Sequence, residues 1–137
     1  GGFGALHTAL AYPKPFGKAA GLSSALLVHE IAKMKPGDSN SVANYEYYRE
    51  CFGDLDKVEE SDNNPETLVK KLLAKGEKLP EMYICCGTED FLLESNRAFS
   101  AFLKSQGVAH VYEEGPGMHD MKFWSQSVEK VIPWMFG

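Results

Sequence analysis

The sequence is short of the features that mark several classes of protein. Among its 137 residues no apolar run approaches the roughly 18 residues that a transmembrane helix needs. The formal net charge is −5, and the Lys residues are scattered or paired with Glu, so the chain has no general attraction to nucleic acid. We therefore expect neither a membrane nor a nucleic acid as its partner.

Cysteine and clustered metal ligands are also scarce. The three Cys residues cannot all pair within the chain, and Cys85 and Cys86 are neighbours in an apolar run, where a strand would point them to opposite faces. Reduced, buried thiols and a cytoplasmic location fit this pattern. His29-Glu30 lacks the second His of a zinc helix, and no other cluster has metal-ligand spacing, so no metal is expected.

The chain does contain an alternation of strands and helices. With 44% hydrophobic and 12% aromatic residues it can form one packed domain over residues 1–137. The apolar periodicity predicts helices over 3–11, 25–34, 42–52, 65–75, 97–106 and 124–135, and strands over 16–22, 82–86 and 108–113. The run 82–86 lies between Pro80 and Gly87 and is typical of a strand buried on both faces. Together these elements predict an α/β fold, a mostly parallel sheet with helices on both faces.

Residues 38–80 differ from the rest of the chain in being polar, acidic around 54–60 and interrupted at Asn63-Asn64-Pro65. We expect this segment, the polar excursion, to lie on the surface between two core strands. Its second helix would have Pro65 in the first turn and Leu68, Leu72 and Leu73 as its buried stripe. In the last helix of the chain, the buried stripe is predicted to be Trp124, Val128, Val131, Ile132 and Met135.

Two loops at the ends of predicted strands carry groups that can do chemistry. Asp90 follows the strand 82–86, and His119 follows the strand 108–113. The carboxyl ends of parallel strands meet at one edge of a sheet, where ligands gather. A carboxylate bonded to one imidazole nitrogen fixes the tautomer and stabilises the imidazolium that forms when the other nitrogen takes a proton from a nucleophile. Asp90 and His119 fit these two roles.

The first residues indicate where a nucleophile would be. The chain order nucleophile, acid, histidine is that of α/β-hydrolases, and Gly1 stands where the final glycine of a Gly-x-Ser-x-Gly elbow would lie. The serine would then belong two positions before Gly1, outside this sequence. We therefore expect the chain to hold two members of a triad and to be inactive alone.

Three motifs resemble the esterase D group of α/β-hydrolases, particularly its tributyrin and acetyl esterase members. They are Gly-Gly-Phe-Gly-Ala-Leu at 1–6, Gly-Thr-Glu-Asp-Phe-Leu at 87–92, and Pro-Gly-Met-His-Asp at 116–120 with Phe123-Trp124. The resemblance spans nearly the whole chain and implies the C-terminal half of an α/β-hydrolase, with Asp90 as triad acid and His119 as base. It implies a serine carboxylesterase of short-chain acyl esters that works through an acyl-serine intermediate without a cofactor.

The same resemblance places the nucleophilic serine and the oxyanion donors outside this chain, so the missing N-terminal half of the domain is an expected partner beside the small ester substrate. The strand 16–22 would then lack its neighbour and leave an exposed hydrophobic edge. No feature of the sequence specifies an oligomeric state.

Other interpretations remain open at this stage. Asp90 could cap a helix that starts near Phe91, and His119 could be an ordinary loop histidine. Asp120 is a rival acid, although it also suits the cap of the following helix. Ser23, in a Gly-Leu-Ser-Ser-Ala segment, loosely resembles an elbow and is an internal candidate for the nucleophile. A non-catalytic α/β binding module is the alternative function, and a small flavodoxin-like domain is a third.

Overall fold

A parallel three-stranded sheet lies at the centre of the structure, a computed structural model that describes all 137 residues. The strands are β1 (Lys18–Leu22), β2 (Glu81–Gly87) and β3 (Val111–Gly115), in the order β1-β2-β3 with both pairs parallel. The helices are α1 (Gly2–Ala11), α2 (Val28–Ile31), α3 (Tyr45–Phe52), α4 (Pro65–Ala74), α5 (Leu93–Ser105) and α6 (Met121–Phe136), with a short 3₁₀ helix η1 (Leu55–Glu60). The predicted α/β fold is confirmed.

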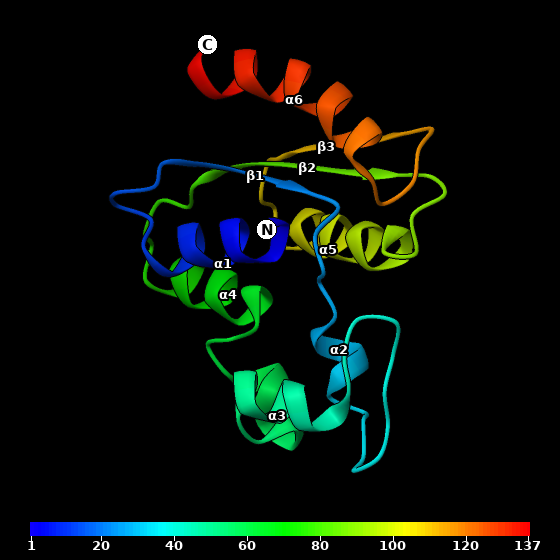
Figure 1. The fold of residues 1–137 in the computed structure, drawn as a ribbon. Helices are drawn as coiled ribbons and strands as arrows, with labels where there is room; N and C mark the ends of the chain where they lie inside the picture. Colours follow the sequence, from blue (N-terminus) through cyan, green and yellow to red (C-terminus); the bar gives the residue numbers. More distant parts are fainter.

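The middle strand β2 is buried on both of its faces, as its apolar run predicts. Met82 and Ile84 point into the core formed with α1, α4 and α5, and Tyr83 and Cys85 point to the opposite face. Figure 1 shows these two layers, with α1, α4 and α5 on one side of the sheet and α6 on the other. The helices thus cover both faces of the sheet.

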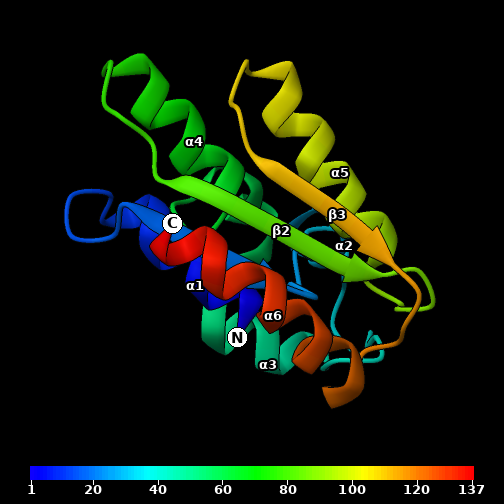
Figure 2. The same ribbon diagram turned by 90° about the horizontal axis from the view of Figure 1, so that it is seen from above.

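The two faces are covered to different extents. On the first, α1 and α5 contribute fully buried Leu6, Leu10 and Leu103. On the second, α6 packs alone, with Phe123 and Val131 against the sheet. The view in Figure 2 shows α6 lying on the β1 side of the sheet, with β3 to one side of it. This face is therefore covered only along a narrow band.

The polar excursion is divided between two cores: α4 belongs to the core under the sheet, whereas α3 and η1 form a small core with α2. Tyr48 of α3 and Leu55 and Val58 of η1 are buried with Val28 and Ile31 of α2. This unit lies below α1 and α4 in Figure 1, on the side away from the sheet.

The predicted end of α3 at Gly53, which has φ of 76°, and the predicted start of α4 at Pro65 are confirmed. Helix α3 begins at Tyr45, later than predicted, because the side chain of Asn44 accepts from Tyr47 N–H and caps it there.

Several predicted boundaries are wrong. The helix predicted over 25–34 is reduced to α2, because Ser24 is buried at the end of β1 and the chain leaves it in a turn, with Leu26 N–H donating to Ser24 O. Helix α5 begins at Leu93, earlier than predicted, because the side chain of Asp90 accepts from Leu92 N–H just before it. Strand β3 begins at Val111, since Val108 N–H still bonds to the end of α5.

Two predicted apolar stripes are partly wrong. Leu73 of α4 is 39% exposed, and Val69 takes its place in the core. On α6 the buried residues are Phe123, Ser127 and Val131, whereas Val128 and Ile132 are 38% and 52% exposed. A single helix over one edge of a small sheet buries a narrower stripe than its apolar periodicity covers.

No helix of the structure combines the length and the apolar character needed to cross a lipid bilayer.

The attachment of α2 to the polar excursion is predicted to depend on pH. The two ring nitrogens of His29 face the carboxylates of Glu59 and Glu66, and the hydrogen bond to Glu59 is the main reason that the pKa of His29 is raised. A raised pKa in the folded state stabilises the fold fully below about pH 6.5, the ordinary histidine pKa, and this stabilisation is lost as pH rises through the higher folded value. The free energy of unfolding should therefore fall as the pH rises above about 6.5.

The control is H29Q, which cannot titrate. Its thermal unfolding temperature should lack this part of the pH dependence, so the difference between the natural chain and H29Q should shrink at the higher pH. A difference that stays constant with pH would show that protonation of His29 contributes nothing.

Candidate active site

Asp90 and His119 meet at the carboxyl ends of β2 and β3. The distance from His119 Nδ1 to Asp90 Oδ2 is 3.0 Å, and the Asp90 side chain is 0% exposed while that of His119 is 37% exposed. A carboxylate can only accept, so Nδ1 carries the proton and Nε2 is left as a hydrogen-bond acceptor. Nε2 makes no hydrogen bond within the chain. The ring is thus held at one nitrogen and available at the other.

Asp90 also closes the turn that leads into α5. Its Oδ1 accepts from Leu92 N–H at 2.8 Å while Oδ2 faces His119. The prediction that Asp90 caps a helix starting near Phe91 is wrong, since α5 begins at Leu93 and Asp90 closes the turn before it; the two oxygens nevertheless have separate partners, Leu92 N–H and His119. These contacts orient the carboxylate, because rotation of the side chain toward solvent would break both hydrogen bonds.

Backbone contacts fasten the acid loop to the histidine loop. Thr88 N–H donates to Gly115 O at 2.8 Å and Glu89 N–H donates to Gly117 O at 3.0 Å. The Glu89 carboxylate accepts from Gly117 N–H at 2.8 Å, and this bond, followed by one from the Thr88 hydroxyl, lowers the pKa of Glu89. The relative position of the two loops is therefore set by main-chain geometry before any contact between the functional side chains.

Two aromatic rings contact the His119 imidazole. Trp124 in the first turns of α6 lies edge-to-face, with the ring centroids 4.9 Å apart and the planes at 88°. Phe91 lies at 5.4 Å with the planes at 54°. The indole is itself fixed, since Trp124 Nε1–H donates to Ser23 Oγ at 3.0 Å.

The His119 ring borders a cavity of about 450 Å³ that also contains the start of the chain. Its lining includes Gly1 and Gly2 together with Ser23, Phe91 and Trp124. A Cβ on Gly2 would lie 2.3 Å from Ser24 Oγ and 2.9 Å from Leu22 O, so α1 begins in close contact with the end of β1. The glycines in which the sequence suggests the end of an elbow therefore lie beside the histidine.

The rival candidates lie elsewhere or are otherwise engaged. Ser23 is 4% exposed and bonds to Trp124, not to His119. The Asp120 carboxylate accepts from Phe123 N–H and caps α6. Cys85 and Cys86 are buried inside β2, where burial raises the pKa of both thiols, that of Cys86 to about 12. They remain protonated and are poor nucleophiles.

The other three histidines have structural partners. His7 Nε2 bonds to the backbone oxygen of Asp62, His29 bonds to two glutamates, and His110 Nε2 bonds to Ser100 Oγ at 2.7 Å. His110 Nδ1 donates to Val108 O, so the Ser100 hydroxyl donates to Nε2 and ties α5 to the segment before β3. No group of three or more His, Cys, Asp or Glu side chains could hold a metal ion.

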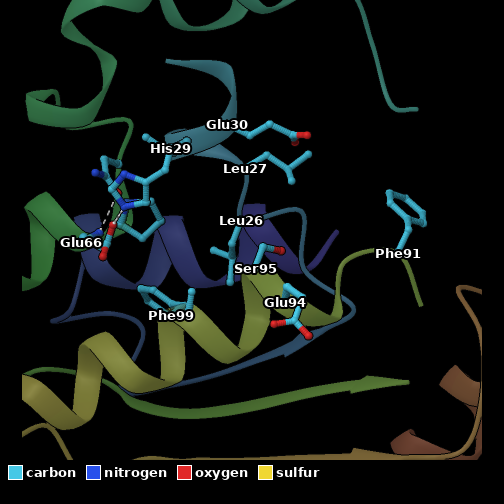
Figure 3. A pocket seen from close by; sticks show the side chains of 13 residues that line it. Leu26, Leu27, His29, Glu30, Glu66, Phe91, Glu94, Ser95 and Phe99 are labelled. Carbon is cyan, nitrogen blue, oxygen red and sulfur yellow. Dashed lines mark hydrogen bonds and ion pairs between the residues drawn. The ribbon is translucent and has the colours of Figure 1, made fainter. Parts of the chain in front are cut away.

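A second cavity, of about 320 Å³, lies between α2 and α5 and is shown in Figure 3. Leu26, Leu27 and Phe99 give it an apolar lining, and Glu66, bonded to His29, lies at one side of it. Phe91 lines both this cavity and the one that holds His119. The polar excursion thus borders the surroundings of the site through Asn64, Pro65 and Glu66.

The sequence alone does not indicate that Trp124 and Phe91 contact His119 or that Ser23 bonds to Trp124. The Phe123-Trp124 pair contributes to the family resemblance and was the available signal for the indole. The pairing of Ser23 with a residue 101 positions away has no local signal in the sequence.

A short parallel sheet with helices on both faces, and with an acid and a histidine at the carboxyl ends of adjacent strands, has the fold of the C-terminal half of an α/β-hydrolase. Over 135 residues the chain is 42% identical to an acetyl esterase from Caldicellulosiruptor saccharolyticus, a match that covers 98% of this chain and 51% of that protein. No family model matches the chain.

The chain is also similar to solved structures of hydrolases, again over about half of their length. The chain matches S-formylglutathione hydrolase from Staphylococcus aureus with a TM-score of 0.80 and 29% identity, over 99% of this chain and 51% of the other. A fluorophosphonate-binding serine hydrolase F of the same organism gives a TM-score of 0.79 at 29% identity, with the same coverage. A ferulic acid esterase at 18% identity, with a TM-score of 0.65 over 98% of this chain and 47% of the other, shares the fold. The chain spans about half the length of the relatives that it matches.

The crossing of the two loops is predicted to tolerate no side chain at Gly87. A Cβ there would lie 2.3 Å from Gly117 O, a backbone atom that cannot move without disturbing the hydrogen bond that it accepts from Glu89 N–H. We expect G87A to lower the free energy of unfolding by about 1–3 kcal/mol, measured by urea denaturation.

The matched control is G115A in the partner loop, where a Cβ would meet no atom within 4 Å. This substitution should change the free energy of unfolding by no more than about 0.5 kcal/mol. Equal effects of the two substitutions would contradict the tight crossing at Gly87.

Proposed function

We propose that this chain supplies the acid and the base of a serine carboxylesterase that acts on short-chain acyl esters. The observation that carries the proposal is the His119 imidazole, which is bonded through Nδ1 to the buried Asp90, has no partner at Nε2 and lines a cavity together with Gly1 and Gly2. This is the arrangement of acid and base that an acyl transfer to serine requires. The similarity to an acetyl esterase and to serine hydrolases supports it.

The chemistry assigns a role to each group. His119 Nε2 takes the proton of the serine hydroxyl as its oxygen attacks the ester carbonyl, and the imidazolium then gives that proton to the departing alcohol. The Asp90 carboxylate keeps the Nδ1 tautomer and stabilises the imidazolium. Water then attacks the acyl-serine carbonyl while Nε2 takes its proton; the bond between the acyl carbon and the serine oxygen breaks, the imidazolium returns the proton to that oxygen, and the carboxylic acid leaves. The serine and the donors for the oxyanion come from outside these 137 residues.

We assign the missing groups to a complementary N-terminal half that continues the sheet beyond β1. Glu81 N–H donates to Gly17 O and Ser23 N–H donates to Cys85 O, so alternate residues of β1 face β2. The backbone groups of Lys18, Ala20 and Leu22 consequently face the free edge, where another strand could pair. A cavity of about 500 Å³ lies along this edge and is lined by Gly4, Ala5, Ala9, Phe16, Ala20 and Met135 among others.

The state of the cysteines supports a cytoplasmic location as part of the same proposal. Cys51, Cys85 and Cys86 are all free, as is usual in a reducing compartment.

The isolated chain is predicted to be inert toward esterase substrates and probes. We expect no turnover of p-nitrophenyl acetate above the rate in buffer and no labelling by a fluorophosphonate, because no serine is placed to give its proton to His119. Mass spectrometry of the treated chain provides the measurement. Labelling at Ser23 would overturn the prediction and restore the internal nucleophile.

A chimera is predicted to be active. The N-terminal half of the Caldicellulosiruptor acetyl esterase, joined directly before Gly1, should complete the domain, since this chain is 42% identical to the half that it replaces. The chimera should hydrolyse p-nitrophenyl acetate, and D90N should lower kcat roughly 10⁴-fold by favouring the wrong tautomer of His119. H119A should lower kcat by about 10⁴-fold or more.

The control for D90N is D54N. Asp54 accepts from Asp56 N–H through Oδ1, as Asp90 does from Leu92 N–H, but Asp54 has no histidine partner. D54N should therefore change kcat by less than about twofold, an effect that corresponds to a few tenths of a kcal/mol. A folded, active chimera whose rate is unaffected by D90N and H119A would refute the assignment of acid and base.

A further inference from the structure

A single hydrogen bond does not by itself fix the orientation of the His119 ring. The imidazole is 37% exposed, and its only hydrogen bond is from Nδ1 to Asp90. Rotation about that bond would carry Nε2 through an arc, whereas proton transfer needs Nε2 within about 2.6–3.2 Å of the group that it deprotonates. A displacement of about 1 Å can cost a catalytic site on the order of a hundredfold in rate. The ring therefore needs a lateral support.

Trp124 is the better placed of the two aromatic neighbours to give that support. Its ring lies 4.9 Å from that of His119, against 5.4 Å for Phe91, and Phe91 is 58% exposed. Trp124 belongs to a regular helix whose start is fixed by the Asp120 cap. The indole also has a polar anchor, since Nε1–H donates to Ser23 Oγ.

The backbone at Ser23 has an uncommon conformation that is held by hydrogen bonds. Ser23 is the single residue other than glycine with a positive φ, 51°, a conformation that side-chain-bearing residues rarely adopt. The backbone is held on both sides, because Ser23 N–H donates to Cys85 O and Asn96 Nδ2 donates to Ser24 O, each at 2.9 Å. Strained backbone of this kind persists where the surroundings over-determine it, and it gathers at functional sites. Here it presents a buried hydroxyl to the indole.

We propose that Ser23 and Trp124 are positioning residues that together form a brace for the His119 imidazole. Ser23 fixes the indole through its hydroxyl, and the indole restricts the ring of His119 to the orientation in which Nδ1 meets Asp90. Neither residue exchanges a proton with the substrate. The catalytic value of the brace rests on the proposed function, but the restraint on the imidazole exists in the 137-residue chain without a nucleophile.

The test measures exchange of the His119 Nδ1 proton with water by NMR in this chain, beside the thermal unfolding temperature. S23G removes the hydroxyl and relieves the left-handed backbone, so the chain should unfold at nearly the same temperature. The exchange rate should nevertheless rise about fivefold, the effect of losing one ordinary hydrogen bond that holds the indole. If Ser23 only stabilised the fold, S23G would change the exchange rate only together with the unfolding temperature. S23A removes the same hydroxyl without relieving the backbone and should raise the exchange rate equally.

A double-substitution cycle tests whether Ser23 acts through Trp124. W124F removes the indole N–H and should also raise the exchange rate, and adding S23G in that background should change the rate no further. The matched control is S24A, because Ser24 Oγ is buried beside Ser23 but has no hydrogen-bond partner. S24A should leave the exchange rate of the His119 proton unchanged.

Three outcomes would overturn the brace: an unchanged exchange rate in S23G, an equal effect of S23G in the presence of W124F, or an equal effect of S24A. An inactive chimera together with the expected exchange rates would refute the esterase proposal and leave the brace standing. An active chimera with unchanged exchange rates in S23G would refute the brace alone.

Discussion

The close approach of Gly87 to Gly117 is the constraint on which the candidate site depends. With no side chain at Gly87, the loop after β2 can lie against the loop after β3, and main-chain bonds from Thr88 and Glu89 hold the two together. Asp90 follows directly, so its carboxylate is delivered to the same place as the imidazole of His119. The side-chain hydrogen bond is therefore a consequence of a main-chain arrangement that is already in place.

The positions of the two functional groups could be predicted because they depend on topology. Any residue that follows a parallel strand lies at the same edge of the sheet, so Asp90 and His119 could be paired without knowledge of any side-chain contact. The support around them could not be predicted in this way. The bond between Trp124 and Ser23 depends on how α6 crosses the end of β1, and the positive φ of Ser23 arises from tertiary bonds on both sides of it.

Val128 and Ile132 of α6 are exposed although the apolar periodicity predicts them to be buried. The reason for this difference supports the proposed N-terminal half of the domain. Trp124 lies at the end of β1 and Met135 lines the cavity along its free edge, so Val128 and Ile132, which fall between them on the helix, are on the same side. They are exposed because the sheet stops at β1. A sheet that continued beyond β1 would extend beneath them, and the apolar periodicity of α6 would then match the surface that it covers.

The structure also explains why the segment around Ser23 resembles a nucleophile elbow in the sequence. Its glycine, Gly21, is needed because a Cβ there would lie 2.5 Å from Ser24 Oγ and 2.7 Å from Leu6 Cδ1, so the requirement comes from the packing of α1 against β1. The sharp turn that follows directs the Ser23 hydroxyl to the indole, whereas a nucleophile would need to face His119 Nε2. The residues that resemble an elbow in the sequence thus form the turn that places Ser23 against Trp124. The hydrogen bond from His119 to Asp90 and the contacts of its ring with Trp124 and Phe91 all lie within this chain, so none of them requires the proposed serine.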